Sequence, residues 1–225
     1  MSLAERLRAV EERIAGACRQ AGRDRAEVRL LPVTKTLPSS VLRDAYALGL
    51  TELAENRVQE LTAKAADLSD LDVRWVVIGH LQRNKAGAVV DLAAELQSLD
   101  SLALAEVLDR RLQAAGRGMD VLVQVNTSGE ATKSGLHPDD VLTFTESLRP
   151  HTGLRPRGLM TVAAPGAEPA AACFRLLADL RARLQDRDGG GWGELSMGMS
   201  GDLEQAVTHG ATCVRIGSAI FGARA

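Results

Sequence analysis

The stretch VRLLPVTK, residues 28–35, gives the clearest indication of the fold class. It is a short apolar run of the kind that forms a buried strand. Residues 38–40 (PSS) follow it and open a helical pattern through Val41, Ala45 and Leu48. A buried strand that passes directly into a helix is typical of a parallel α/β sheet.

The same alternation extends outward from this stretch in both directions. A helical stripe over residues 2–21 precedes it, and further strands are predicted at 51–53, 73–79, 95–99, 121–125, 153–160, 194–198 and 212–217, with helices between them. Eight such units in 225 residues suit a compact (β/α)8 TIM barrel. A doubly wound open sheet is the alternative, because the second and seventh strand signals are weak. We therefore predict one barrel domain over residues 1–225 with an extra N-terminal helix.

Composition narrows the functional classes. A net charge of −2 and an aromatic content of 3% argue against a nucleic-acid partner. No uncharged apolar run approaches the ~18 residues of a membrane span, and the charged N-terminus lacks the apolar stretch of a signal peptide. We expect a cytoplasmic protein without a membrane partner. The three cysteines stand far apart and the histidines lack paired spacing, which predicts neither a disulfide framework nor a metal site.

Polar residues recur where the predicted strands end, which is where barrel sites lie. Among them, Lys35 is the sharpest candidate, because only four of the 27 basic residues are lysines and this one ends an apolar strand. Removing an amine from water favours its neutral form, which attacks aldehydes. From position alone, a lysine whose ammonium simply reaches water is the plainer interpretation.

Two glycine- and serine-rich segments follow the last two strands. SMGMSGD (196–202) and IGSAIFG (216–222) each precede a short helical pattern, and such segments hold phosphate through backbone amides. Two ordinary tight turns would look similar. Together with Lys35 they indicate a ligand with an aldehyde and a phosphate, either pyridoxal 5′-phosphate (PLP) or a sugar phosphate on a Schiff-base lyase. Arg215 favours PLP if its guanidinium faces a pyridine nitrogen. Its position at a strand end is equally compatible with an arginine that forms a salt bridge.

Six motifs in order along residues 28–222 resemble one known family. They are LLPVTKTLP (30–38), AENRVQE (54–60), IGHLQRNK (78–85), VNTSGEATKSG (125–135), RGLMT (157–161) and LSMGMSGDLEQAV with GATCVRIGSAIFG (195–222). Together they resemble the pyridoxal-phosphate homeostasis proteins, single-domain relatives of the alanine racemase N-terminal barrel.

The resemblance implies a role for six residues. Lys35 would hold PLP as a Schiff base, Asn56 would hydrogen-bond it, and Arg215 would face the ring nitrogen. The phosphate would bind at Ser200, Gly217 and Ser218. Weaker pocket candidates are His80, Met160 and Met199. The sequence departs from the family pattern at Leu53-Ala54, at Val76-Val77 and at Ser218, which replaces a frequent threonine and keeps the hydroxyl.

The resemblance implies a binding protein rather than a strong catalyst. Racemases with this barrel take a second base, a tyrosine, from an additional domain, and this sequence ends a few residues after the last barrel motif, with Tyr46 as its single tyrosine. An arginine at the ring nitrogen also weakens the electron sink. We therefore expect a monomer that buffers PLP and delivers it to PLP-requiring apoenzymes. A PLP enzyme with weak amino-acid racemase-like activity is the alternative.

Overall fold

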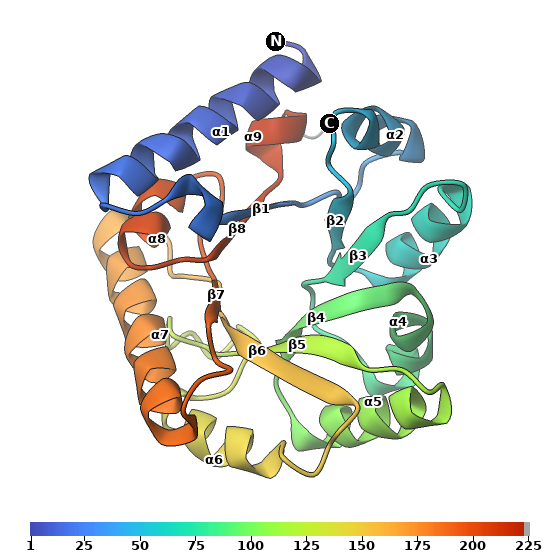
Figure 1. Ribbon diagram of the computed structural model, residues 1–225, viewed down its shortest axis with the longest axis vertical. Helices are drawn as coiled ribbons and strands as arrows, with labels where there is room; N and C mark the ends of the chain where they lie inside the picture. Colours follow the sequence, from blue (N-terminus) through green and yellow to red (C-terminus); the bar gives the residue numbers. More distant parts are fainter. Residues whose placement is uncertain (223–225) are drawn as a thin grey trace.

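The computed structural model describes residues 1–222 and forms a barrel of eight parallel strands (Figure 1). The strands are β1 (Arg29–Pro32), β2 (Glu52–Glu55), β3 (Arg74–Val77), β4 (Ala93–Leu99), β5 (Met119–Gln124), β6 (Leu154–Met160), β7 (Glu194–Ser196) and β8 (Cys213–Ile216). The hydrogen-bonded order is β1-β8-β7-β6-β5-β4-β3-β2. A single parallel bridge between Val33 and Ala54 joins β1 to β2 and closes the ring. The predicted barrel is confirmed.

Helices surround the strands. They are α1 (Leu3–Gln20), α2 (Ser39–Ala47), α3 (Val58–Asp67), α4 (Ala86–Leu92), α5 (Leu102–Ala114), α6 (Val141–Ser147), α7 (Ala167–Asp188), α8 (Leu203–Thr208) and α9 (Ser218–Phe221), with 3-10 turns η1 (Arg25–Glu27), η2 (Arg83–Lys85) and η3 (Pro138–Asp140). None of the helices within residues 1–222 combines the length and the apolar character that a membrane crossing needs.

The extra helix α1 covers the outside of the barrel. Ser2 and Glu5 form a capping box at its start, and its buried face includes Val10 and Ile14. This face packs against α8 and α9, beside β8 and β1 (Figure 1). The apolar stripe of residues 2–21 is therefore buried against other helices of the same chain.

The strand boundaries differ from the sequence prediction by up to three residues, and those of β1 and β4 are examples. Strand β1 ends at Pro32. The amide of Val33 still donates to Ile216 of β8 at 2.9 Å, and Val33 also bridges to Ala54 of β2, to which the Thr34 amide donates. Lys35 therefore lies in the loop that follows the strand. Strand β4 begins at Ala93, which pairs with Trp75 of β3, two residues before the predicted strand at 95–99, and α4 ends at Leu92.

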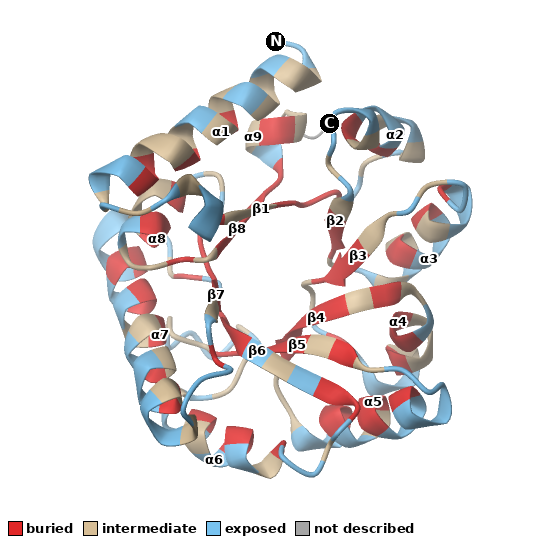
Figure 2. Cartoon of the chain, in the orientation of Figure 1, coloured by how far each residue is buried: buried red, intermediate tan, exposed pale blue. Residues whose placement is uncertain are grey.

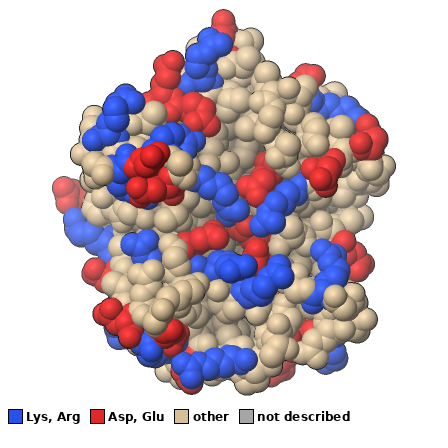
Figure 3. Space-filling view, viewed as in Figure 1, with Lys and Arg blue, Asp and Glu red and all other residues tan. Residues whose placement is uncertain are grey.

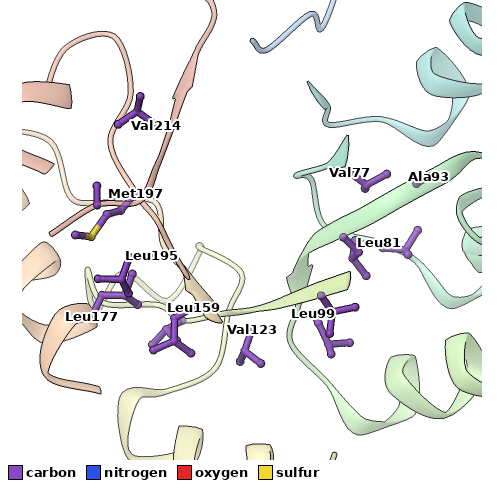
Figure 4. Close-up of a cluster of buried hydrophobic side chains, with 14 of the residues drawn as sticks. Val77, Leu81, Ala93, Leu99, Val123, Leu159, Leu177, Leu195, Met197 and Val214 are labelled. Atoms are coloured by element: carbon purple, nitrogen blue, oxygen red, sulfur yellow. The ribbon is translucent and has the colours of Figure 1, made fainter. Parts of the chain in front are cut away.

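The core has two shells. The larger shell fills the space between strands and helices, where Leu159 and Leu195 of the strands meet Leu177 of α7 (Figure 4). Helix faces that turn toward the barrel are accordingly buried and their outer faces exposed (Figure 2). A small inner cluster of Leu31, Val33, Ala54, Val76 and Cys213 fills the barrel itself. All three cysteines are buried and unpaired.

Charged residues occupy the amino-terminal end of the barrel interior. Glu95 is 2% exposed and accepts hydrogen bonds from both terminal nitrogens of Arg29, at 2.8 and 2.7 Å. Arg74 adds a third contact to Glu95 at 3.2 Å. Acidic and basic side chains lie side by side across the middle of the face in Figure 3. These ion pairs fill the amino-terminal end of the barrel, and the candidate site lies at the opposite end.

Candidate functional site

A cavity of about 490 Å³ opens at the carboxyl ends of the strands. The loops after β1, β2, β3, β6, β7 and β8 contribute to it, together with one side chain of β8. It is lined by Val33, Lys35, Asn56, Ile78, Gly79, Val162, Met199, Ser200, Gly201, Arg215, Gly217 and Ser218. All six residues that were predicted from the sequence as PLP ligands therefore line one cavity, although they are spread along the sequence from residue 35 to residue 218.

Lys35 enters this cavity from the loop after β1. Its side chain is half-buried, and its ammonium makes no hydrogen bond or ion pair with residues 1–222. Two other lysines differ in this respect. Lys64 pairs with Glu55 at 2.7 Å, and Lys133 pairs with Glu130 at 2.7 Å. The Lys35 amine thus lies in the cavity without a partner among the described residues.

Ser200 connects the loops after β7 and β8. Its Oγ accepts hydrogen bonds from the Ser218 hydroxyl and from the Ala219 amide, both at 3.3 Å. The amides of Ser200, Gly201 and Ser218 donate to no acceptor within residues 1–222. Two hydroxyls and several unused amides therefore face the same part of the cavity, which is the arrangement that oxyanions bind.

Gly198 fixes the path of the loop after β7. Its φ of +93° lies in the region that favours glycine, and a Cβ there would stand 2.5 Å from the Cβ of Ala206. Arg13 of α1 holds the same loop from outside, because its guanidinium donates to the carbonyl of Ser200 at 3.0 Å and to Glu204 at 2.6 Å. The loop is thus anchored on both sides.

Arg215 points from β8 into the barrel. It is 4% exposed, and its two terminal nitrogens donate to Ser196 Oγ at 2.8 Å and to the Thr161 carbonyl at 2.7 Å. Burial lowers the pKa of its guanidinium below the usual value, although arginine stays protonated in proteins. Ser196 in turn donates to Gln97 Oε1 at 2.6 Å. The cation is therefore held rigidly at the cavity floor.

Asn56 follows β2 directly and forms part of the cavity wall. Its Oδ1 is buried and has no hydrogen-bond partner within residues 1–222. Gly79 packs against its backbone so closely that a Cβ at that position would lie 2.0 Å from the Asn56 carbonyl oxygen. Buried acceptors are normally hydrogen-bonded, so Asn56 Oδ1 is available to a hydrogen-bond donor of a ligand.

The weaker candidates are distributed differently. Met199 lines the cavity, whereas Met160 is 1% exposed and does not. His80 lines a neighbouring cavity of about 160 Å³, and its Nδ1 lies 3.3 Å from Asp100 Oδ2. Tyr46 lies on α2 and is not among the lining residues. Of the positions that depart from the family pattern, Leu53, Ala54, Val76 and Val77 are buried in the barrel wall and do not line the cavity. Ser218, the remaining one, lines it.

The ionisable side chains that line the cavity, among residues 1–222, are those of Lys35 and Arg215. The described residues hold no group of three metal-ligating side chains. Sequence reasoning missed the apolar lining residues Val33, Ile78 and Val162, whose one signal is their place one or two residues after a strand. The cavity therefore offers an amine, a fixed cation and an oxyanion grip.

Known proteins are similar to almost the whole of this chain. The model of the alanine racemase N-terminal domain matches residues 6–225. The pyridoxal phosphate homeostasis protein of Pseudomonas aeruginosa is 44% identical over 99% of this chain and 96% of its own length. That of Aquifex aeolicus is 40% identical over 100% of this chain and 99% of its own.

Solved structures give the same result. PipY of Synechococcus elongatus, solved with PLP bound, is 36% identical over 98% of this chain and 100% of its own, with a TM-score of 0.86. Alanine racemase of Streptomyces coelicolor is 19% identical, covers 97% of this chain and 59% of its own, and has a TM-score of 0.74, a likeness of fold alone. Barrel, cavity and relatives together place this chain in the family of the pyridoxal phosphate homeostasis proteins, which share the barrel of the alanine racemase N-terminal domain.

Proposed function

We propose that this protein binds PLP in the 490 Å³ cavity and serves PLP homeostasis by buffering and delivering the cofactor. Lys35 would hold the cofactor as a Schiff base, in which the amine nitrogen bonds to the aldehyde carbon and water leaves. The observation that carries the proposal is the Lys35 amine, which has no partner in the described part of the chain and shares one cavity with a separate oxyanion grip. The relatives' names and the PLP-bound structure of PipY support it.

Each part of the cavity fits one part of PLP. The hydroxyls of Ser200 and Ser218, with the backbone at Gly217, would bind the phosphate. Arg215 would face the pyridine nitrogen, and Asn56 has an unused buried acceptor at the wall. PLP supplies an aldehyde for the lysine and a dianion for the grip, which are the two groups that the cavity is equipped to meet.

Delivery rather than turnover follows from the same residues. A protonated ring nitrogen makes PLP a stronger electron sink for carbanion chemistry, and a cationic arginine at that position disfavours the proton. Among the lining residues, Lys35 and Arg215 are the ionisable ones, so a second base for a two-base racemisation is missing from the described cavity wall. We propose further that residues 1–225 act as one domain, as a monomer, in the cytoplasm, and that PLP-requiring apoenzymes receive the cofactor.

Two assays separate this function from weak racemase-like activity. In the first, the PLP-loaded protein is mixed with a PLP-free aminotransferase, and recovery of transferase activity is followed. In the second, exchange of the α-hydrogen of alanine is followed by NMR in heavy water. We expect the loaded protein to restore transferase activity in the first assay. In the second, we expect the α-hydrogen of alanine to exchange no faster than it does with free PLP. Rapid exchange that Lys35→Ala abolishes, without transfer, would instead establish the enzyme.

A further inference from the structure

A second lysine is buried directly behind the Lys35 loop. Lys64 of α3 is 6% exposed, and its ammonium donates to Glu55 Oε1 at 2.7 Å, to Glu60 Oε2 at 3.0 Å and to the Thr34 carbonyl at 2.8 Å. An ammonium has three N–H donors, so each has an acceptor here. Lys64 does not line the PLP cavity. Lys64 can therefore affect the cavity only through its partners, Thr34, Glu55 and Glu60.

Those partners grip the chain on both sides of Lys35. The Thr34 hydroxyl donates to Glu55 Oε1 at 2.5 Å, and the Thr36 amide donates to Glu60 Oε2 at 2.6 Å. The two carboxylates that Lys64 joins therefore fix the residue before Lys35 and the residue after it. Glu55 also directly precedes Asn56, another residue of the cavity wall.

The backbone at Thr36 needs such a grip. Its φ of +64° makes it the one residue other than glycine with a positive φ among residues 1–222. A β-branched residue in that conformation is strained, and such strain persists only where the surroundings impose it. The bond from its amide to Glu60 supplies that restraint. This turn directs the chain away from β1 immediately after the Lys35 side chain.

The charges of the cluster depend on one another. Burial raises the pKa of Glu55, although Lys64 and Thr34 donate hydrogen bonds to it. Burial also opposes ionisation of Glu60, but the Thr36 amide and Lys64 outweigh it and lower the pKa of this carboxyl. Removing Lys64 would leave Glu55 as a buried carboxyl without a cation, which is strongly unfavourable.

We propose that Lys64, Glu55 and Glu60 form a positioning clamp that holds the backbone of Lys35, so that its amine meets the PLP aldehyde. The inference rests on the proposed PLP binding. It assigns to Lys64 no contact with the cofactor. The clamp lowers the cost of ordering the Lys35 loop, and preorganisation of this kind appears in the affinity for the ligand.

Glu60→Ala is the first test, because its side chain is 22% exposed and the Glu55–Lys64 pair survives its removal. In the protein without PLP, we expect faster hydrogen exchange of the Thr36 amide. In titrations with PLP, we expect the dissociation constant to rise roughly tenfold, because small misplacements of a reacting group are costly. Glu60→Gln keeps an acceptor oxygen for the Thr36 amide and should restore most of both properties.

Lys64→Met and a matched control complete the design. Lys64→Met should lower the fraction of Lys35 that borohydride traps at saturating PLP, whereas Lys85→Met, which alters a lysine outside the cavity, should trap like wild type. If Lys64→Met does not fold, the two Glu60 variants still decide. The clamp would be overturned if Glu60→Ala kept the wild-type hydrogen exchange of the Thr36 amide and the wild-type affinity for PLP. It would also be overturned if Glu60→Ala and Glu60→Gln were impaired equally in both properties. A wild-type protein that gives no Lys35 adduct would overturn the proposed function instead, and the exchange measurement would still decide the clamp.

Discussion

Replacing Ser200 by alanine should weaken the binding of PLP while leaving the empty protein almost unchanged. In the absence of ligand, Ser200 Oγ accepts two hydrogen bonds, both at 3.3 Å, near the long limit for such bonds. Their loss should cost at most about 1 kcal/mol of folding free energy. A hydrogen bond from a hydroxyl to a phosphate dianion is worth more, about 1.5–3 kcal/mol. The dissociation constant for PLP should therefore rise roughly tenfold to hundredfold.

The assay compares PLP with pyridoxal, which has the aldehyde and the ring but no phosphate. Absorption titrations of wild type and Ser200→Ala with each ligand give four dissociation constants, and a thermal melt of each protein reports folding. Ser147→Ala is a matched control, because that hydroxyl bonds a carbonyl of its own helix on the far side from the cavity. The reasoning is refuted if Ser200→Ala binds PLP like wild type, or if its affinity for pyridoxal falls by the same factor.

Three further predictions concern other parts of the barrel. Arg215→Met should weaken PLP and pyridoxal alike, because the guanidinium meets the ring and not the phosphate; an effect on PLP alone would assign Arg215 to the phosphate. Gly198→Ala should destabilise the fold by about 1–3 kcal/mol, since the new Cβ lies 2.5 Å from that of Ala206 at a φ of +93°; thermal unfolding at the wild-type temperature would contradict this. Glu95→Gln should destabilise the fold at neutral pH, but by less than the ~3–5 kcal/mol lost when a fully buried pair is broken, because Arg29 keeps Glu194 at 3.4 Å and Glu52 at 3.6 Å. Burial opposes ionisation of Glu95, but hydrogen bonds and charge from Arg29 outweigh it and hold its pKa below the unfolded value. The stabilisation is thus present above the unfolded pKa and is lost as pH falls through the lower, folded one. Urea unfolding from pH 7 downward should show the gap between the two proteins closing in acid, and a gap independent of pH would contradict the assignment.

The barrel and the six proposed ligands could be predicted because their signals are local. Several strands are short apolar runs, and a parallel barrel brings all carboxyl ends to one face. Lys35, Ser200 and Arg215 could thus be assigned to one site without knowledge of any contact between them. The resemblance of the motifs then gave each residue its expected partner on the ligand.

The buried charges could not be predicted, because their partners are distant in sequence. Glu95 reads as an exposed residue of a strand, and its partner Arg29 is 66 residues away. Lys64 reads as the polar face of a helix, although the carbonyl it holds belongs to Thr34, 30 residues earlier. Only closure of the barrel turns these side chains inward. The strain at Thr36 likewise has no sequence signal, since threonine rarely adopts a positive φ.

The central claim is that Lys35 carries the cofactor, and reductive trapping tests it most directly. The purified protein is incubated with PLP, its visible absorption is recorded, borohydride is added, and peptide masses locate the modified lysine. The account predicts a yellow protein with one pyridoxyl group on Lys35 and none on Lys64, Lys85 or Lys133. A protein that stays colourless with Lys35 unmodified, or a pyridoxyl group on another lysine alone, would contradict it.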